Sequence, residues 1–306
     1  VHRIRTIAPN IILLARGVAY GERMTVLHNA RRLTELDLAC PVISAGNTAC
    51  REEVKELLGE RVRVVPNVYP RIDELNIKPT REAIQEVFEE HIVAAPGMRS
   101  MRRRVSGDVM PTPGAVMKAA ELLQPAVGNV MVLDVGGATT DVHSVTKDSA
   151  EVARMLIAPE PFAKRTVEGD LGVFKNAANL VERIGKERLA EDLGFEPNAV
   201  LEGLQPLPAD QDEQRLVVRL AEEAVRVAVE RHAGHTRHLY GPAGRSTIAE
   251  GKDLTLVRWI IGTGGPLTAL PEGSAILEEL TKTPPPMALY PREAEVRVDA
   301  DYVMAV

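Results

Sequence analysis

The segment Val130 to Val145, VMVLDVGGATTDVHSV, constrains the fold of this chain more than any other stretch. An apolar run ends at Asp134, two glycines follow, and Asp141 lies in a second run of strand-forming residues. Strand patterns on both sides of a glycine pair predict two strands joined by a tight turn. We therefore expect a hairpin with one acid on each strand.

The predicted turn carries groups that suit a phosphate. Gly136 and Gly137 let backbone N–H groups approach an anion, and Thr139 and Thr140 add hydroxyl donors. The two flanking carboxylates would repel a bare phosphate, so they make chemical sense mainly with a divalent cation such as hydrated Mg²⁺ between them. We expect a nucleotide site here. The alternative is an ordinary hairpin whose glycines serve only the turn.

The composition describes a soluble globular protein. The 306 residues suit about two domains, with 45% hydrophobic and 26% charged residues. A formal charge of -6 gives no basic footprint for nucleic acid, and no apolar run approaches membrane-spanning length. We expect no signal peptide, and Cys40 and Cys50 are the only cysteines in the sequence. We expect a cytoplasmic protein without a disulfide framework.

The first part of the chain alternates strand and helix patterns. Apolar runs and helical spacing predict, in order, a strand at 10–15, a helix at 22–36, a strand at 41–45, a helix at 48–58 and a strand at 61–65. This alternation is typical of a parallel, helix-covered sheet, so the fold class is α/β. The turn at 16–21 follows a strand end, where ligands bind in such sheets, but a plain connecting loop is the alternative.

The middle of the chain predicts a domain boundary. A helix is expected at 79–90, then a loop at 94–108 that carries Arg99, Arg102, Arg103 and Arg104. Such arginines either dock an acidic surface or are simply solvated. A second helix at 111–123 leads into the hairpin. We place the boundary near residue 125, with 1–125 as the first lobe and 126–306 as the second.

Acidic residues beyond the hairpin are further candidates. A strand is predicted at 151–157, and the polar segment 164–172 then leads towards a helix. Glu168 or Asp170 in that segment could orient an attacking water, whereas the alternative is that Asp170 caps the helix. A long amphipathic helix at 211–231 ends in three histidines, His232, His235 and His238, but Gly234 interrupts the face that a shared metal would require.

A second glycine turn follows a later strand. After a short strand at 246–249, the segment Leu256 to Thr268 reads LVRWIIGTGGPLT. Its apolar run leads into Gly262, Thr263, Gly264 and Gly265, where backbone can press against a flat or anionic ligand. This turn would supply a second wall for the site at the hairpin.

Several motifs resemble a known superfamily and a family within it. The string D-V-G-G-A-T-T-D-V-H-S resembles the second phosphate motif, D-L-G-G-G-T-F-D-V-S, of the Hsp70 and actin ATPases, and the later glycine turn is similar to their adenosine motif. The blocks ILLARG, VLHNARRL, PVISAGN, MPTPGAV, PFAKRTVEGDLG, RHAGH and DADYVMA extend the resemblance over nearly the whole chain. Together they resemble the MutL or GlmL proteins associated with adenosylcobalamin-dependent glutamate mutase, which are unrelated to mismatch-repair MutL.

The resemblance implies a fold, a cofactor and a partner. The fold would be the two-lobed actin-like ATPase fold, shared by Hsp70, actin and sugar kinases. The function would be that of an ATP-dependent chaperone or reactivating factor for an aminomutase, binding ATP and Mg²⁺ but not cobalamin directly. The oligomeric state stays open.

The resemblance also implies residue roles. Asp134 would hold the Mg²⁺ hydration shell, with Asp141 as a second metal or water-positioning acid. Gly136, Gly137, Thr139 and Thr140 would receive the β and γ phosphates. Gly262, Thr263, Gly264 and Gly265 would lie against adenosine and its α phosphate, with Glu168 and Asp170 as weaker catalytic candidates.

One departure from the superfamily pattern concerns the first lobe. The superfamily's first phosphate hairpin, D-x-G-x-T, is not found in this sequence, so we interpret the first lobe as incomplete. The chain begins with Val1 and closes in DADYVMAV, which reads as the opening of a helix, so we expect sequence to be missing at one or both ends. Weak nucleotide binding or loss of hydrolysis would follow.

Two other functions are alternatives. A small-molecule kinase shares the fold but needs a base beside its acceptor. A nucleotide-responsive scaffold would hydrolyse ATP only incidentally. Mutase chemistry itself is not expected, because the base-off cobalamin motif D-x-H-x-x-G does not occur. The chain is an ATPase at most.

Overall fold

The computed structural model describes residues 2–36, 40–71, 74–93, 104, 110–241 and 244–304. The chain forms two compact units, Val1–Pro111 and Thr112–Val306. The division precedes the helix that begins at Thr112, because that helix packs on the sheet of the second unit. Of the four arginines in the predicted loop, Arg104 is exposed, and the other three lie outside the described residues.

The first unit contains a small parallel sheet, as the alternating pattern predicted. The strands lie in the order β1-β2-β3, and both ladders are parallel. Its elements are α1 His2–Ile7, β1 Ile12–Leu14, α2 Met24–Thr34, β2 Val42–Ser44, η1 Thr48–Cys50, α3 Arg51–Leu58, η2 Gly59–Arg61, β3 Val62–Val64 and α4 Lys78–Val93. The α/β class predicted for this part of the chain is confirmed.

Apolar residues on both faces of this sheet hold the first unit together. Val26, Ala30 and Val54 of α2 and α3 pack with the sheet residue Val42, while Ile43 points to the other face and packs against α4.

The turn at residues 16–21 is held in place by hydrogen bonds within the first unit. Its backbone is held by Asn47, whose amide donates to the carbonyls of Gly21 and Glu22. The connecting-loop interpretation of this turn agrees with that arrangement.

The second unit is built on a five-stranded mixed sheet. The strand order is β10-β9-β4-β5-β6, with parallel ladders among β10, β9 and β4 and antiparallel ladders from β4 through β5 to β6. The strands are β4 Val130–Val135, β5 Thr140–Val145, β6 Ala163–Glu168, β9 Trp259–Thr263 and β10 Glu295–Val298. The predicted hairpin is therefore confirmed, and β4 and β5 form the centre of this sheet.

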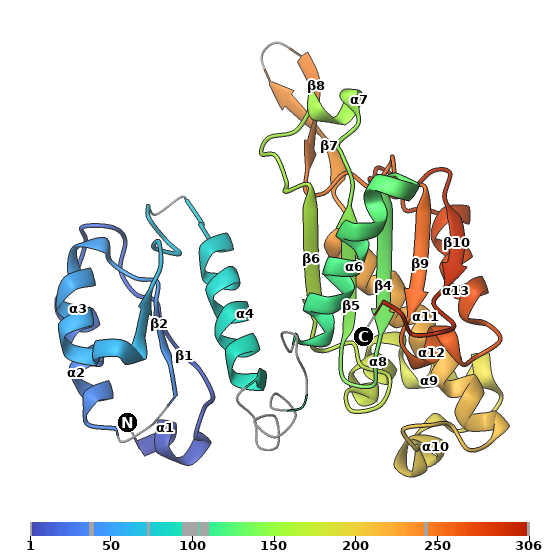
Figure 1. Ribbon diagram of the computed structural model, residues 1–306, viewed down its shortest axis with the longest axis horizontal. Helices are drawn as coiled ribbons and strands as arrows, with labels where there is room; N and C mark the ends of the chain where they lie inside the picture. The colour runs from blue at the N-terminus through green and yellow to red at the C-terminus, as the bar shows by residue number, and fades with distance from the viewer. Residues whose placement is uncertain are drawn as a thin grey trace. The chain divides into compact units, whose positions relative to one another are not determined.

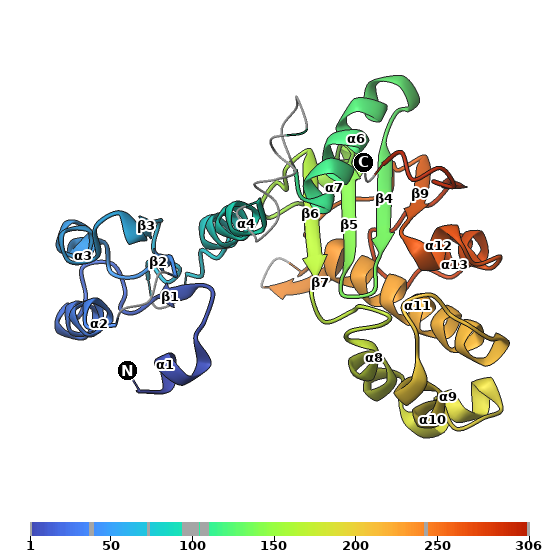
Figure 2. The same cartoon turned by 60° about the horizontal axis from the view of Figure 1, so that its bottom comes forward.

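Helices cover both faces of the five-stranded sheet, as Figure 2 shows. Met131, Leu133 and Val135 pack against the face that carries α11. Val130 and Val132, which point the other way, pack with α6. The helices are α6 Thr112–Val127, α7 Ala150–Ala153, α8 Ala177–Ile184, α9 Lys186–Leu193, α10 Pro197–Gly203, α11 Gln211–His232, α12 Gly265–Thr268 and α13 Gly273–Lys282.

A two-stranded hairpin stands apart from this sheet. β7 His235–Gly241 and β8 Gly244–Glu250 pair only with each other in a ladder, and Figure 1 shows them extending away from the main sheet. The strand predicted at 246–249 is thus one arm of a longer hairpin. The hairpin leaves α11 directly, so the helix ends where Gly234 predicted.

Two predicted elements differ in the structure. The strand predicted at 151–157 is wrong: residues 150–153 form the short helix α7, because the Ser149 hydroxyl caps it by accepting from the Val152 amide at 3.2 Å. The predicted helix opening at the end of the chain is also absent from residues 299–304. There the Asp299 carboxylate accepts the amides of Val303 and Met304, while Tyr302 has a φ of +54°, which a helix does not allow.

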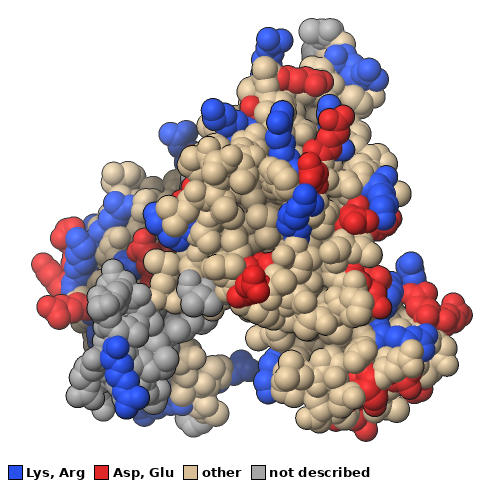
Figure 3. All heavy atoms as spheres, turned by 45° about the vertical axis from the view of Figure 1, so that its right-hand side comes forward, with Lys and Arg blue, Asp and Glu red and all other residues tan. Residues whose placement is uncertain are grey.

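The surface of the second unit mixes both signs of charge, and Figure 3 shows acidic and basic side chains interspersed over the face in view. Among the described residues, every helix is too short or too polar to cross a membrane.

The three histidines at the end of α11 do not meet. His232 is fully buried, where its Nε2 lies 2.7 Å from the Ser144 hydroxyl and its Nδ1 lies 2.9 Å from the Thr166 hydroxyl. His235 and His238 lie on β7. Within the described parts of the chain, no cluster of three or more metal-binding side chains occurs. Burial, and then the charge of Lys164, holds the pKa of His232 well below its usual value.

This buried histidine predicts acid sensitivity. The pKa of His232 is lower in the folded state than in the unfolded state. Below about pH 6.5 the histidine is therefore protonated in the unfolded chain but stays neutral in the native state. Native stability consequently falls as the pH drops through that value. Between pH 7.5 and pH 5.0, His232→Gln should lose about 2 kcal/mol less unfolding free energy than the wild type.

Urea unfolding followed by Trp259, the only tryptophan in the chain, measures this difference in the second unit. His238→Gln, a change on the exposed hairpin, is the control and should keep the wild-type pH dependence. An unchanged pH dependence in His232→Gln would contradict the assignment of the effect to this residue.

Candidate functional site

Strand register brings three acids and a threonine to one edge of the second-unit sheet. Asp134 lies opposite Asp141 in the β4–β5 ladder and beside Thr263 in the β4–β9 ladder. The β9–β10 register places Asp299 next to Thr263, whose hydroxyl donates to Asp299 Oδ2 at 3.0 Å. Side chains at paired positions point to the same face. All four therefore lie on the α6 face, at the carboxyl ends of β4, β9 and β10.

Asp141 is a buried acid with an unsatisfied oxygen. It is 2% exposed, and among the described residues its Oδ1 has no hydrogen-bond partner. Burial, followed by the negative charge of Asp134, raises the pKa of Asp141 to about 7, although a hydrogen bond from Thr139 acts in the opposite direction. A buried carboxylate oxygen without a donor is expensive, so this atom indicates a ligand or cation that the protein alone does not supply.

Asp134 connects the two predicted glycine motifs. Burial and the charge of Asp299 raise its pKa. Gly264 has a φ of +86°, and a Cβ at that position would overlap the Val135 carbonyl and lie 2.7 Å from Asp134 Oδ1. Only glycine satisfies both the backbone angle and the close approach. The turn after β9 therefore packs directly against the acid at the end of β4.

The turn between β4 and β5 presents free amides. The Gly136 amide donates to the Thr139 carbonyl at 2.9 Å and closes the turn, while the carbonyls of Gly136 and Gly137 accept amides from residues 173–175 behind it. Across the residues that the structure describes, no hydrogen bond engages the amides of Gly137 or Ala138, and both residues are exposed. Successive free N–H groups of this kind can bind an anion.

The two threonines of the motif have different surroundings. The Thr140 hydroxyl is buried and donates to the Leu171 carbonyl at 2.7 Å on the α11 side of the sheet, so it does not face the turn. Thr139 lies in the turn itself and contacts Asp141. Of the two hydroxyls, only that of Thr139 lies near the free amides.

Glu168 and Asp170 are both bound by Arg231, although the charge of Glu168 also acts on Asp141 and raises its pKa. Glu168 is opposite Thr140 in the β5–β6 ladder, so its side chain shares the α11 face. Arg231 Nη1 binds Glu168 Oε2 at 2.6 Å and Asp170 Oδ1 at 2.7 Å, and Nη2 binds Asp170 Oδ2 at 2.8 Å. The hydrogen bonds from Arg231 lower the pKa of Asp170. Asp170 does not cap α8 either, since that helix begins at Ala177.

Asp299 is the site residue that sequence reasoning missed. It was interpreted as part of a helix start, although the run Glu295 to Val298 before it alternates like a strand. An acid directly after an alternating run repeats the arrangement at Asp134 near the end of β4. That repetition is a signal which the sequence does contain.

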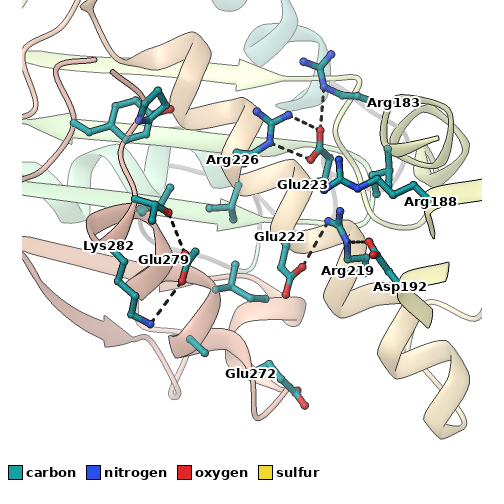
Figure 4. Close-up of a pocket in the computed structure, with 18 residues that line it drawn as sticks. Arg183, Arg188, Asp192, Arg219, Glu222, Glu223, Arg226, Glu272, Glu279 and Lys282 are labelled. Carbon is teal, nitrogen blue, oxygen red and sulfur yellow. Dashed lines mark hydrogen bonds and ion pairs between the residues drawn. The ribbon is translucent and has the colours of Figure 1, made fainter. Parts of the chain in front are cut away.

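A separate groove of about 900 Å³ lies between α8, α9, α11 and α13. Its charged side chains largely satisfy one another: Figure 4 shows Glu223 between Arg183, at 3.3 Å, and Arg226, at 2.7 Å. Arg219 likewise binds Asp192 at 3.0 Å. Since none of the paired acids or glycine turns lines this groove, we place the candidate site at the sheet edge, where polar groups lack partners.

The paired acids predict a stability difference. Because the folded-state pKa of Asp141 lies above the unfolded value, native stability falls as the pH rises from about 4 to about 7 and stays lower above that range. In Mg²⁺-free buffer at pH 8, Asp141→Asn should therefore unfold with a free energy higher than wild type by an amount on the order of 4 kcal/mol, and the gain should vanish near pH 4.

Urea unfolding at the two pH values tests this expectation. Asp170→Asn is the matched control, and it should lower stability because it weakens the ion pair with Arg231. Equal stability of Asp141→Asn and wild type at pH 8 would contradict the burial of an unpaired carboxylate.

Comparisons with known proteins identify the family. The MutL protein family matches residues 1–306. Protein MutL of Clostridium tetanomorphum is 35% identical over 330 residues, covering 100% of this chain and 70% of that protein. A solved structure of an exopolyphosphatase-like protein is 17% identical with a TM-score of 0.20, covering 84% of this chain and 55% of that one, a similarity too low to support an argument about the fold. The chain belongs to the MutL protein family that its sequence blocks resemble, and not to the mismatch-repair proteins.

Proposed function

We propose that this chain is a nucleotide-binding protein with the actin-like ATPase fold and that its ligand is ATP with Mg²⁺. The observation that carries the proposal is the combination of two free amides, at Gly137 and Ala138, with two adjacent acids, Asp134 and Asp141, at one sheet edge. Amides suit phosphate oxygens, and paired acids suit a cation that the phosphates share.

The residues present fit a magnesium ion. Among the described residues Asp141 Oδ1 is buried without a donor, and the pKa values of both acids are raised, first by burial and then by a neighbouring acid, Asp299 for Asp134 and Asp134 for Asp141. Mg²⁺ is usually held by one or two carboxylates, several waters and substrate phosphates. When bound, it would neutralise charge on the phosphate oxygens. Asp134 and Asp141 would hold it, most simply through its waters.

The other residues would have positioning roles. The amides of Gly137 and Ala138 would receive phosphate oxygens, and the Thr139 hydroxyl, which bonds Asp141, would hold that acid beside them. Gly264 and its neighbours would lie beside the nucleoside, since the turn after β9 already contacts Asp134. Hydrolysis would also need a group that orients water. Asp141 is better placed for this than Glu168 or Asp170, which Arg231 binds.

The cellular role that we propose is that of a chaperone or reactivating factor. Membership in the MutL family and 35% identity to Protein MutL support a role associated with glutamate mutase or a related adenosylcobalamin-dependent aminomutase. In this proposal the partner is a mutase subunit in the cytoplasm, and this chain binds nucleotide rather than cobalamin. ATP turnover would drive release of damaged cofactor from the partner.

Isothermal titration calorimetry with ATP and Mg²⁺ tests the nucleotide site. Asp134→Ala should weaken binding by at least about 10-fold, because a charge-assisted contact to the hydrated cation is worth roughly 1.5–3 kcal/mol. The control is Asp212→Asn, an exposed acid at the start of α11. Unchanged binding in Asp134→Ala would remove the central assignment.

Reactivation of an inactivated aminomutase tests the cellular role. The purified mutase should regain activity with ATP, Mg²⁺, fresh cofactor and the full-length MutL protein, and Asp134→Ala in that protein should abolish the recovery. If ADP release depends instead on a small-molecule acceptor, the protein is a kinase. Nucleotide-dependent self-association in light scattering, without any effect on the mutase, would indicate a scaffold.

A further inference from the structure

The segment at residues 299–304 lies against the glycine turn that follows β9. The Thr268 hydroxyl donates to the Gly264 carbonyl at 2.9 Å, so in its 2.7 Å contact with Tyr302 the phenolic hydroxyl is the donor. A Cβ on Gly265 would lie 3.8 Å from the same phenolic oxygen. Figure 1 shows this last part of the chain returning beside α12. An aromatic side chain thus stands next to the turn that packs against Asp134.

Several bonds fix the backbone that carries this side chain. The Asp299 carboxylate accepts the Thr263 hydroxyl at 3.0 Å, the Val303 amide at 2.9 Å and the Met304 amide at 3.0 Å. Met304 is buried with Val130 and Val132 in the core under α6. Tyr302, held between these anchors, has a φ of +54°, which is uncommon for a bulky residue. The ring position is therefore imposed by the segment on both sides.

Packing does not explain the position of the Tyr302 ring. The side chain is 40% exposed and belongs to none of the hydrophobic clusters among the described residues. Tyr290, by contrast, is 5% exposed and part of the main core. A fixed, partly exposed aromatic ring beside a glycine turn is a suitable surface for a flat ligand.

We propose that Tyr302 and Thr268, beside Gly265, form the nucleoside subsite of this protein. The subsite takes the base and ribose of a nucleotide whose phosphates bind at the turn between β4 and β5, so it rests on the function proposed above. The ring provides a stacking face, and the hydroxyl oxygens of the pair can accept hydrogen bonds from ribose hydroxyls. Asp299 is a positioning residue that holds the segment in place.

Two ligands separate this subsite from the phosphate site. Calorimetry is performed on the chain with ATP and with inorganic tripolyphosphate, each with Mg²⁺. Tyr302→Ala should weaken ATP binding by roughly 10-fold or more, the usual range for loss of one base–aromatic contact, and leave tripolyphosphate binding unchanged. Tyr302→Phe keeps the ring, so it should lose less ATP affinity than Tyr302→Ala.

The controls distinguish a binding role from a structural one. Tyr240→Ala removes an exposed tyrosine on β7, 79% accessible, and should bind both ligands like wild type. Asp134→Ala should weaken both ligands. Thermal unfolding followed by Trp259 checks that each variant is folded.

The outcomes are distinct. The subsite is overturned if Tyr302→Ala binds ATP like wild type, or if it loses affinity for both ligands equally, and in either case the phosphate site stands. It is also overturned if the wild-type chain binds ATP no more tightly than tripolyphosphate. A wild-type chain that binds neither ligand would overturn the proposed nucleotide function and the subsite with it.

Discussion

The burial of Asp134 and Asp141 opposite each other is the constraint on which the rest of the second unit depends. Paired strands place the two carboxylates opposite each other, and in the part of the chain that the structure describes, Asp141 Oδ1 has no donor. Burial, followed by the charge of a neighbouring acid, raises the pKa of each carboxyl group, and an ionised acid so placed lowers stability. A sheet that keeps such a pair must hold it with interactions elsewhere, and natural proteins accept this cost mainly where a ligand uses the groups.

The two hydrophobic layers supply that support. Met131, Leu133 and Val135 alternate with Val130 and Val132 along β4, so one strand serves the cores on both faces, and Asp134 takes the next position on the α6 face after Val132. Pairing of β4 with β5 and β9 then leaves the acids little freedom to separate. The β4–β5 and β4–β9 ladders therefore both force the acids together and keep them rigid. The arrangement is preorganised without a ligand.

Sequence alone predicted the parts of the site that have a local pattern. Alternating residues and a glycine pair predict the hairpin, and the apolar run before Gly262 predicts β9 and its turn. The pairing of Arg231 with Glu168 and Asp170 joins residues more than sixty positions apart, at separations of 63 and 61, and leaves no periodic signal. The hairpin of β7 and β8 was only half recognised, because its first arm is polar and follows a helix without a turn motif.

The meeting of the two glycine motifs depends on a single parallel ladder. Asp134 aligns with Thr263 in the β4–β9 pair, and this alignment puts Gly264 against the Asp134 carboxylate. A shift of β4 by one residue would turn Asp134 towards the α11 core and Leu133 towards the site, because side chains alternate between faces. Burial of Leu133 and Val135 thus selects the register that assembles the site. The core packing of β4 and the placement of its acid are consequently specified by the same strand, whereas Asp299, which follows β10, had no part in that local pattern.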